Sequence, residues 1–573
     1  MKIRTICQIF VITFSLLFCF IFEASALFQG NPKLLSNYAS LNDAVADIGT
    51  TEALLVIDTK VILEDKSVTI PSTMTLQFVK GNIIKGTPGG KIEILTFSSQ
   101  AGLNVIANDN QQIFGSSLTV VGLSLANPRW FGAVGNGVAN DYDEIIAALA
   151  SLTGGGTLYV PAGTYVTLQS EFIDIPYTTH IKGDGVGKTI FHKARFISDQ
   201  VDNLQFSDFS INDGHYGWEL FECNYPTWTN VEFIGDYDDS TPRGIQVYGS
   251  SHGKVINSHF EEGQFFLWLK DNATAPTIAG GYPKDYNAAV SSDNVDWLIK
   301  NNSFGPNPAT AVYPAAVNVA AGTNVVVDGN YFKDLLATGA SHGYAFYQGD
   351  NTTAEASDLI VSNNIADNID FAFAATHNAS RVTVTSNIAY NTSILFYGFG
   401  SGIVAVDPRD YTIRDNYGDG FILQETDIGI TFYNMVITRN TIITGGYGIF
   451  LNAKTLTDTI RNVVISDNMI TNSEDSGIKV SKSYNVNIHD NIVVDPNTDG
   501  NAAGAAGNNA HIELLSSVNV KVHDNLLIQT AAGLSHHAIN QNSYSISNEF
   551  YNNMVLNEDG GQVWSKIYRN IHL

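Results

Sequence analysis

Two stretches near the C-terminal end of the chain repeat one phrase: NVNIHDNIV, Asn485 to Val493, and NVKVHDNLL, Asn519 to Leu527. Each alternates apolar and polar residues over a few positions, reaches an asparagine, and then resumes a strand-like pattern. The two copies begin 34 residues apart. Repetition at this distance predicts a solenoid, in which each repeat forms one coil and stacks on the coil before it.

The same pattern recurs at intervals of 23 to 34 residues over much of the chain, and weaker copies extend it to at least residues 157–556. The repeats contain no helical stripe, and short strands at this period are typical of a parallel β-helix, with coils about 4.8 Å apart. We expect one asparagine per coil to lie in a tight turn, to tolerate left-handed backbone and to bond its neighbours in an internal ladder. We interpret these asparagines as scaffold: Asn302, Asn330, Asn364, Asn387, Asn416, Asn440, Asn468, Asn491, Asn525 and Asn553.

The charge balance restricts the partners. The chain has 56 acidic against 30 basic residues, a formal net charge of −26. Nucleic acid is therefore excluded as a partner, since its phosphates would be repelled. An acidic polysaccharide would also be repelled, unless a local basic strip or bound cations intervene.

The N-terminus reads as an export signal. Lys2 and Arg4 precede an apolar run from Ile6 to Phe22, and a small-residue cleavage pattern ends at Ala26. We predict that residues 1–26 are a signal peptide and that the mature chain is secreted, extracellular or periplasmic, with no membrane segment. Cleavage leaves Cys223 as the single cysteine, so we expect no intrachain disulfide.

One segment carries a family resemblance: NPRWFGAVGNGVANDYDEIIAALASLTGGGTLYVPAGTYV, Asn127 to Val166. It resembles the opening of the β-helix domain of the pectate-lyase superfamily, whose members typically read W/F-G-A-x-G-D-G-x-x-D-D, then a short helix, then G-G-G-T-x-x-x-P-x-G-x-Y. Asn136 and Asn140 stand where that pattern has aspartates. Asparagine also caps helices and turns, so we expect the local structure to be kept.

The resemblance implies an all-β fold, a right-handed single-stranded parallel β-helix, with a short capping helix over residues 142–152. We divide the chain into the signal peptide, a small N-terminal β accessory module over residues 27–126, and a pectate-lyase-like β-helix domain over residues 127–573. A member of this family is expected to act on an extracellular polysaccharide. The state expected in solution is a monomer or a homotrimer.

A second repeat, glycine followed by alternating apolar residues, locates a candidate binding face. Strand alternation places Trp218 and Leu220 inward and Glu219 and Phe221 outward. Outward aromatic side chains on neighbouring coils would form platforms for sugar rings. The predicted substrate-binding residues are Phe221, Gln246, Tyr248, Phe266, Trp268, Tyr347 and Glu425.

Ionisable residues at or near the ends of the same strands are the catalytic candidates. A lyase needs a base for the C5 proton and a cation for the uronate carboxylate, whereas a glycosidase needs two carboxylates across the scissile bond. The sequence leaves both reactions open, and the pairs Glu219 with Glu222 or Asp350 with His377 would serve as proton-transfer pairs. The predicted catalytic residues are Glu219, Glu222, Lys270, Asp350, His377, Asp407 and Arg409.

Two further alternatives remain. Asp407-Pro408-Arg409 resembles the Asp-Pro-His of mannuronan C5-epimerases, with arginine in place of the histidine. A non-catalytic adhesin would use the same face for glycan binding alone. Calcium is the one cofactor suggested, at an acidic loop formed by Asp236, Asp238 and Asp239.

Overall fold

The computed structural model describes most of the chain. The described ranges are 32–63, 67–86, 90–95, 105–167, 172–236, 242–270, 294–307, 310–311, 314–320, 322–338, 342–349, 356–376, 379–400, 408–426, 430–443, 446–454, 459–496, 510–530, 537–542 and 544–556. These residues form two compact units, one running to Val166 and including Tyr177–Asp184, the other containing Thr167–Pro176 and the residues from Gly185 onward. The predicted signal peptide lies outside the described residues, and the predicted module boundary at residue 126 stays a prediction.

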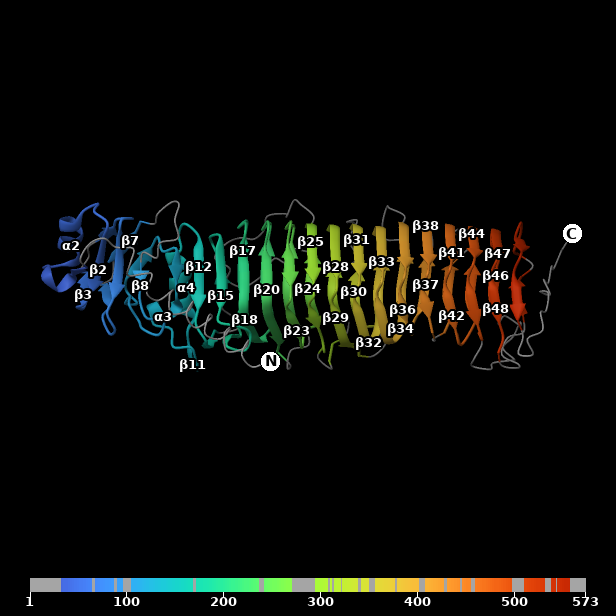
Figure 1. The fold of residues 1–573 in the computed structure, drawn as a ribbon, viewed down its shortest axis with the longest axis horizontal. Helices are drawn as coiled ribbons and strands as arrows, with labels where there is room; N and C mark the ends of the chain where they lie inside the picture. The colour runs from blue at the N-terminus through green and yellow to red at the C-terminus, as the bar shows by residue number, and fades with distance from the viewer. Residues whose placement is uncertain are drawn as a thin grey trace, which may run out of the picture. The chain divides into compact units, whose positions relative to one another are not determined.

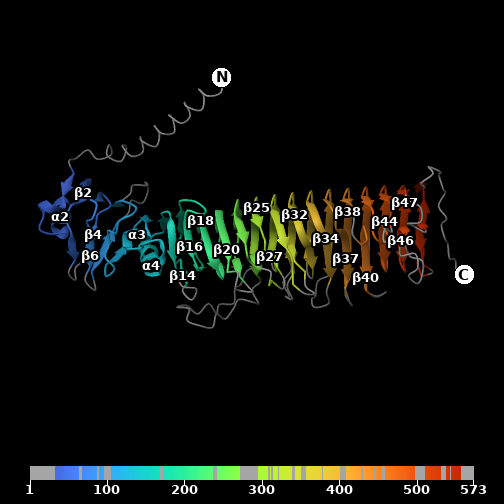
Figure 2. The same ribbon diagram turned by 90° about the horizontal axis from the view of Figure 1, so that it is seen from below.

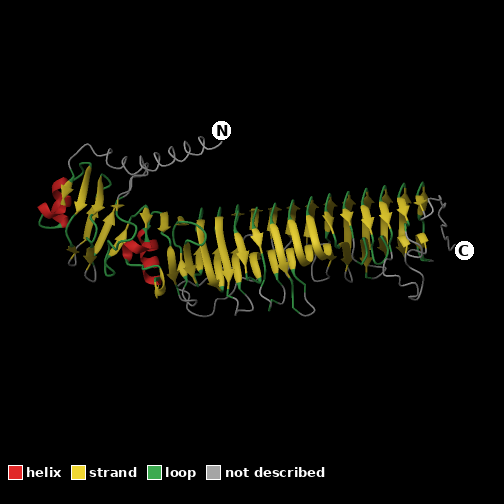
Figure 3. Cartoon of the chain, turned by 60° about the horizontal axis from the view of Figure 1, so that its bottom comes forward, coloured by secondary structure: helices red, strands yellow, loops and turns green. Residues whose placement is uncertain are grey.

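The first unit begins with a short parallel solenoid of its own. Strands β2 (Ala53–Ile57), β3 (Val61–Leu63) and β4 (Ser67–Ile70) pair, in the same order and all in parallel, with β5 (Met74–Phe78), β6 (Ile84–Gly86) and β7 (Lys91–Ile94). The other elements of this unit are β1 (Lys33–Leu34), η1 (Leu35–Asn37), α2 (Leu41–Ile48), β8 (Val105–Ile106), β9 (Thr119–Val121), β10 (Leu125–Ala126), α3 (Pro128–Phe131), β11 (Asn136–Asn140), α4 (Tyr142–Ser151), β12 (Gly156–Val160), β13 (Gly163–Val166) and β15 (Thr179–Gly183). All helices of the described residues belong to this unit (Figure 3).

The segment that carries the family resemblance folds as expected. The predicted helix is α4, and both asparagines act as turn formers and caps. Oδ1 of Asn136 accepts from the backbone N–H groups of Val138 (2.9 Å) and Ala139 (3.0 Å), and Oδ1 of Asn140 accepts from that of Tyr142 at 3.2 Å. The amide oxygen therefore replaces a carboxylate oxygen without loss of the turn.

The second unit is a parallel β-helix, which confirms the predicted fold class. Its coils follow one another from β16 toward the C-terminal end, and each contributes strands to three parallel ladders (Figures 1 and 2). The first ladder consists of β14 (Ile173–Asp174), β17 (Phe196–Asp199), β19 (Tyr216–Phe221), β21 (Arg243–Tyr248), β24 (Phe265–Lys270), β27 (Ala315–Val319), β30 (Tyr344–Gln348), the C-terminal parts of β32 (Ile365–Thr376) and β34 (Ile388–Gly400), β37 (Phe421–Thr426), β40 (Ile449–Ala453), β43 (Ile478–Ser481), β46 (Ala510–Leu515) and β49 (His537–Gln541).

The second and third ladders follow the first within each coil. The second consists of the N-terminal parts of β18 (Gln205–Gly214) and β20 (Thr227–Gly235), then β22 (Lys254–Ile256), β25 (Asn294–Lys300), β28 (Gly322–Asp328), β31 (Ala356–Ser362), β33 (Ala379–Thr385), β35 (Arg409–Arg414), β38 (Thr431–Thr438), β41 (Thr459–Ser466), β44 (Ser483–His489), β47 (Val518–His523) and β50 (Glu549–Tyr551). The third consists of β16 (Thr189–His192), the remaining parts of β18, β20, β32 and β34, and β23 (His259–Glu261), β26 (Ser303–Phe304), β29 (Tyr331–Leu335), β36 (Tyr417–Gly418), β39 (Thr441–Ile442), β42 (Met469–Thr471), β45 (Ile492–Val494), β48 (Leu526–Ile528) and β51 (Met554–Leu556).

The asparagine ladder is present and runs unbroken from Asn302 to Asn553. In each coil the backbone N–H and the side-chain Nδ2 of one asparagine both donate to Oδ1 of the next, as Asn387 does to Asn416 at 3.0 Å each. These amides therefore satisfy one another along the edge of the core and set the register of successive coils.

One detail of that prediction is wrong. The left-handed residue of each turn is not the ladder asparagine but the residue before it, such as Asn363 (φ 55°), Asp415 (φ 57°) and Asp490 (φ 57°). The ladder asparagine needs an orientation that directs its amide inward, while the preceding short polar residue accepts the strained backbone.

Large aromatic side chains fill the core of the first coils of the second unit. Phe206 stacks on Trp228 with centroids 5.4 Å apart, and Phe196 packs edge-on against Phe191 at 5.2 Å. The last coils, from Ile449 onward, have isoleucine, valine and leucine at the inward positions. Cys223 is a free, buried thiol in this core. Across the described ranges, no helix has the length and apolarity needed to cross a membrane.

Candidate functional site on the first ladder

The outer face of the first ladder places one outward residue of each coil beside that of the next. Glu219 on β19 pairs with Gln246 on β21, and Gln246 pairs with Trp268 on β24. The column continues through Asn318 on β27 to Tyr347 on β30. Because coils stack about 4.8 Å apart, residues distant in the sequence form one surface here.

Arg195 holds Glu219 at the start of this face. Nε of Arg195 donates to Oε2 of Glu219 at 2.7 Å, and its Nη2 donates to the same oxygen. The guanidinium group lies over the rings of Phe172 (4.0 Å) and Tyr216 (4.4 Å). The Glu219 side chain is only 3% exposed, so this ion pair is largely removed from water.

Arg243 extends the cationic part of the face by one coil. Its guanidinium carbon lies 5.4 Å from the centroid of the Tyr216 ring and 5.2 Å from that of Trp268. Its Nη1 donates to Oε1 of Gln246 at 3.3 Å. Cations that lie against aromatic faces are oriented without being neutralised, so Arg243 keeps a net charge to offer a ligand.

Lys270 is the next cation along this face, after Arg195 and Arg243. Its Nζ donates to the Tyr248 hydroxyl at 3.1 Å and lies 3.9 Å from the centroid of the Trp268 ring. Burial, reinforced by the nearby Glu219 carboxylate, raises the pKa of Tyr248 above its usual range. Tyr248 is therefore a buried neutral phenol, whose raised pKa makes it a weaker acid than an exposed tyrosine.

Three predicted platform residues are covered rather than exposed. Phe221, Gln246 and Tyr248 expose 3%, 1% and 0% of their surface. The rings of Phe221 and Tyr248 stack with centroids 4.7 Å apart and planes 8° apart. Their expected exposure was wrong because outward side chains on adjacent coils bury one another when they are large.

The outward placement of Phe266 was also wrong. Its ring lies in the interior, with centroids 6.4 Å from Phe260 and 6.1 Å from Phe304. Pairing sets Leu267 beside Ile245 and Val317, so Phe266 occupies the position that Gly244 holds in the preceding coil and Ala316 in the following one. The chain therefore has two consecutive inward residues in β24, which simple alternation does not predict.

Two other aromatic predictions agree with the structure in direction. Trp268 and Tyr347 point outward and are half-buried. Glu425 lies within β37 rather than beyond it, and its carboxylate accepts from the Tyr397 hydroxyl at 3.3 Å and from Nδ2 of Asn452 at 2.8 Å. This carboxylate is thus positioned on the same face, several coils further along.

The sequence analysis did not predict the ion pair of Lys479 and Glu513 on this face. Nζ of Lys479 lies 3.3 Å from Oε2 of Glu513, and the Ser476 hydroxyl donates to the same oxygen at 3.0 Å. The lysine also lies over the rings of Tyr447 (4.8 Å) and Phe450 (5.4 Å). Burial raises the pKa of Glu513.

Arg195 and Arg243 were missed as well. Arg243 directly precedes the glycine of its repeat, as Tyr216 precedes Gly217, and both side chains face outward. That position was a readable signal, because a residue just before a recurrent glycine begins the same strand. Arg195 precedes β17 and offered no comparable pattern.

The remaining catalytic predictions are not brought together. Oε2 of Glu222 accepts from Nε2 of Gln200 at 2.8 Å, in the turn after β19, whereas Glu219 is held by Arg195. Arg409 begins β35, which belongs to the second ladder. The predicted residues Asp350, His377 and Asp407 lie outside the described residues, and so do the potential calcium ligands Asp238 and Asp239. Asp236 is described and follows β20; among the described ranges no three acidic, histidine or cysteine residues form a metal-binding group.

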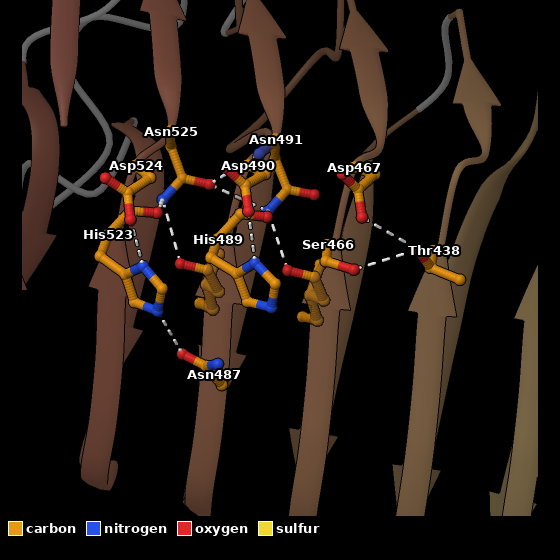
Figure 4. Close-up of polar contacts among 12 residues, drawn as sticks. Thr438, Ser466, Asp467, Asn487, His489, Asp490, Asn491, His523, Asp524 and Asn525 are labelled. Atoms are coloured by element: carbon orange, nitrogen blue, oxygen red, sulfur yellow. Dashed lines mark hydrogen bonds and ion pairs between the residues drawn. The ribbon is translucent and has the colours of Figure 1, made fainter. Parts of the chain in front are cut away.

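The histidines of the repeated phrase form an ordered stack on the second ladder (Figure 4). The rings of His489 and His523 are parallel, 5.1 Å apart, and each Nδ1 lies 2.7 Å from the following aspartate, Asp490 or Asp524. Nε2 of His523 contacts Oδ1 of Asn487 at 3.0 Å. This arrangement repeats with the coil, and its contacts lie within the scaffold.

A shallow hollow of about 490 Å³ also lies on the second ladder, lined by Asn324, Asp358, Ile360, Arg381, Thr383 and Asp410. In this hollow the guanidinium group of Arg381 makes two hydrogen bonds to the Asp358 carboxylate, at 2.6 and 2.7 Å. Both side chains are well exposed. The cations, aromatic rings and buried acids gather on the first ladder instead, so we place the candidate site there.

Comparison with known proteins matches part of this chain to one family. Residues 125–310 match the family described as rhamnogalacturonase A/epimerase, pectate lyase-like. The mannuronan C5-epimerase AlgE1 of Azotobacter vinelandii is 25% identical over 243 residues, which cover 38% of this chain and 17% of that protein. The match thus spans about a sixth of the relative's length.

Two solved structures are similar to this chain over most of its length, at low sequence identity. The A-module of the Azotobacter vinelandii mannuronan C-5 epimerase AlgE6 is 16% identical, with 77% of this chain and 96% of that chain covered and a TM-score of 0.31. The surface adhesin PfbA of Streptococcus pneumoniae is also 16% identical, with 76% and 93% covered and a TM-score of 0.38. Residues 125–310 therefore match a pectate-lyase-like family, in a chain whose described residues form a parallel β-helix.

Proposed function

We propose that this chain binds and acts on a polysaccharide along the outer face of the first ladder. The observation that carries the proposal is a strip of half-buried aromatic side chains on that face, which continues from β19 to β40. Those strands span eight coil-to-coil steps, about 38 Å at 4.8 Å per step, a length suited to a polymer rather than a small molecule. The strip comprises Tyr216, Phe265, Trp268, Tyr344, Tyr347, Tyr397, Phe421 and Phe450.

Two pairs of rings in this strip are in contact, each pair within one strand. Phe265 and Trp268 have centroids 4.4 Å apart, and Tyr344 and Tyr347 have centroids 4.6 Å apart. Rings that are half in water offer an apolar face to the C–H side of a sugar while their polar edges stay solvated. The relatives named mannuronan C5-epimerases support a glycan substrate for this surface.

The cations favour an acidic sugar. Arg243 and Lys270 flank Trp268 and could neutralise a uronate carboxylate on a chain whose formal net charge of −26 would otherwise repel it. Neutralising that carboxylate acidifies the C5 proton, which is the first requirement of β-elimination and of C5 inversion. The described part of the cluster has one carboxylate, Glu219, rather than two carboxylates on facing sides, so we favour β-elimination over hydrolysis.

Export is part of the proposal. A signal peptide over residues 1–26 would deliver the chain to the compartment where such polymers occur. No calcium-dependent step is included, since two of the three acidic residues that suggested calcium lie outside the described residues.

The test is a polymer panel assayed with two variants. The chain is incubated with pectate, alginate, glycosaminoglycans, sulfated galactans and neutral glycans, with calcium or with a chelator. Ultraviolet absorbance reports the unsaturated uronate, new reducing ends report cleavage, and NMR of the polymer reports C5 inversion. Lys270→Met should abolish activity, and Lys521→Met, an exposed lysine on the second ladder, is the matched control.

Each outcome decides the reaction. Absorbance and reducing ends rising together establish a lyase, while reducing ends alone establish a hydrolase and contradict our preference. Inversion without cleavage establishes an epimerase. Equal activity of both variants would refute the placement of the site at Lys270.

A non-catalytic glycan-binding protein is the second candidate, favoured by a specific observation. Glu219, Gln246, Tyr248 and Lys270 expose at most 7% of their surface, whereas the aromatic strip remains half-exposed. A surface of this kind can hold a polymer without bringing it to an acid or base. Retention on a polymer column that is lost in Trp268→Ala, with no reaction on any polymer, would establish this candidate.

A further inference from the structure

One outer edge of the second ladder carries a column of residues with left-handed backbone, one at or just before the start of the strand in each coil. We term it the edge column. From Asn434 to Asn519 it holds asparagine at every coil, and each of these asparagines after the first donates from Nδ2 to Oδ1 of the one before. At the coils that precede Asn434, from Tyr225 to Asp410, asparagine occurs only at Asn324, and the other members carry a ring or a charge.

Two members of the edge column are rings in a backbone conformation that bulky side chains rarely adopt. Tyr225 and His252 both have φ 59°, and among the described residues they are the only aromatic or imidazole side chains with positive φ. Their rings stack with centroids 4.5 Å apart, and Tyr225 exposes 50% of its surface. Strained backbone lowers stability and concentrates at ligand-binding sites, so this exposed stack calls for a functional explanation.

The histidine fixes the position of the stack. Nδ1 of His252 lies 2.9 Å from the Ser251 hydroxyl, and its Nε2 lies 3.1 Å from the Asp296 carboxylate. One face of the Tyr225 ring thus packs on a ring that is held at both nitrogens. The opposite side faces the coil of Asn203, where the edge column has a short side chain. A rigid ring that is half in water is a platform for the C–H side of a sugar.

The hollow of about 490 Å³ lies at the other end of this part of the edge column. Four of its lining residues are column members, and the other two, Ile360 and Thr383, lie two residues further along the same strands. Its volume falls within the range of about 300–1,000 Å³ that is typical of ligand sites. From Tyr225 to Asp410 the column spans six coil-to-coil steps, about 29 Å at 4.8 Å per step.

The charged groups of this surface are paired with one another. Arg381 donates twice to the Asp358 carboxylate and thereby lowers the pKa of Asp358, while the two side chains stay 48% and 42% exposed. Nδ2 of Asn324 donates to Asp296 at 2.6 Å. Across the described ranges, no three acidic, histidine or cysteine residues gather as metal ligands. The surface therefore suits a ligand that carries no charge of its own.

Sugar hydroxyl groups fit this set of partners. A hydroxyl both donates and accepts, so it can bond the remaining lone pairs of the carboxylates and the remaining N–H groups of the amide and guanidinium. Asp410 offers such lone pairs as well, although it accepts from Nδ2 of Asn434 at 2.9 Å. An acidic sugar would meet three carboxylates and one arginine on this part of the column, and would be repelled.

We propose that the edge column from Tyr225 to Asp410 is a second glycan-binding site, which takes an uncharged segment of a polysaccharide. One sugar ring stacks on Tyr225, and further sugars bond the hollow through their hydroxyl groups. The first ladder differs, because Arg243 and Lys270 lie on it beside Trp268 and favour an acidic sugar. This inference does not rest on the reaction proposed for the first ladder, since the two surfaces lie on different ladders and select sugars of different charge.

The experiment gives two members of the column the residue that its later coils hold. Tyr225→Asn and Arg381→Asn should keep the melting temperature of the wild type, because asparagine tolerates left-handed backbone and an exposed ion pair contributes little. Arg439→Asn is the matched control. Arg439 has φ 54° against 52° for Arg381, and it also donates twice to one carboxylate, that of Asp415, at 2.7 and 2.9 Å, but it does not line the hollow.

Binding is measured by the retardation of the full chain in native gels that contain galactomannan, β-glucan, arabinan or starch, with pectate as the acidic comparison. At least one neutral polymer should retard the wild type and Arg439→Asn equally. Tyr225→Asn and Arg381→Asn should need about fivefold more of that polymer for the same retardation, as expected for the loss of one stacked ring or one paired donor. Both variants should act on acidic polymers as the wild type does, so this inference and the proposed reaction fail separately.

Three outcomes would overturn the inference. The first is a wild type that no neutral polymer retards. The second is equal retardation of the wild type, Tyr225→Asn and Arg381→Asn, which would place any neutral-glycan binding elsewhere on the chain. The third is retardation by pectate alone that Arg381→Asn abolishes, which would show that the hollow selects an acidic sugar.

Discussion

Truncating one rung of the asparagine ladder tests the physical account of the fold. Asn416 is 1% exposed, and its side chain and backbone N–H together take part in five hydrogen bonds. Its Oδ1 accepts from the backbone N–H and from Nδ2 of Asn387, at 3.0 Å each. Its Nδ2 donates to the Val384 carbonyl at 3.0 Å and to Oδ1 of Asn440 at 2.9 Å, and its backbone N–H donates to Asn440 at 3.1 Å.

The substitution Asn416→Ala keeps the last of these bonds and removes the other four. It leaves three buried groups without a partner: the backbone N–H of Asn387, one N–H of its amide, and the Val384 carbonyl. Each unpaired buried group costs about 1–3 kcal/mol, so we expect the free energy of unfolding to fall by about 3–6 kcal/mol. That is a large part of the 5–15 kcal/mol of a typical domain.

The matched control is Asn434→Gly, which removes an exposed side chain from the second ladder and tolerates the left-handed backbone at that position (φ 61°). Nδ2 of Asn434 donates to Oδ1 of Asp410 at 2.9 Å, but water replaces that bond, so the loss should stay below about 1 kcal/mol. Urea titration followed by circular dichroism measures both variants. Equal losses for the two would refute the view that satisfaction of buried amides, rather than burial of the core alone, holds the coils in register.

Three other predictions use the same structure. Burial raises the pKa of Glu513, so the folded chain binds a proton there more tightly than the unfolded chain does. The free energy of unfolding should therefore fall as pH rises from about the ordinary pKa of 4.5 through the pKa of the folded chain. Denaturant titrations across that range should show this fall in the wild type and not in Glu513→Gln. Burial also raises the pKa of Cys223 to about 12, so a thiol reagent at pH 8 should label it only after denaturant is added, and labelling of the folded chain at the rate of a free thiol would contradict its burial. Gly329 has φ 68°, at a position where most other coils have asparagine or aspartate, so Gly329→Asn should leave the melting temperature nearly unchanged while Gly329→Val costs about 1–2 kcal/mol, and equal melting temperatures would refute the left-handed requirement.

The fold could be predicted from the sequence because an asparagine recurs once in each coil. Asn468, Asn491 and Asn525 each follow two polar residues and precede a strand, so their spacing alone gave the coil length and the ladder. The capping helix was readable for a similar reason, since the glycines after Leu152 end an amphipathic segment. Local pattern and global fold agree in both cases.

Only part of the candidate site could be predicted from the sequence. Alternation gave the outward direction of Glu219 and Trp268, but it gave neither the burial of Tyr248 nor the inward position of Phe266. Burial on an outer face depends on the size of the neighbours in adjacent coils, here Phe221 above Tyr248. Pairings such as Arg195 with Glu219 join residues 24 positions apart and depend on coil register, which a single repeat motif does not specify.

The asparagine ladder also means that the length of the β-helix can change only in steps of one coil. Intervals between its rungs range from 23 to 34 residues, yet every rung makes the same bonds, so loops absorb differences in coil length while the rise per coil stays fixed. Excising residues 440–467 would join Arg439 to Asn468 and restore the ladder with one coil fewer. The aromatic strip would lose Phe450 and shorten by about 4.8 Å. On the proposed function, the length of glycan that the first ladder would hold is therefore adjustable only in whole coils.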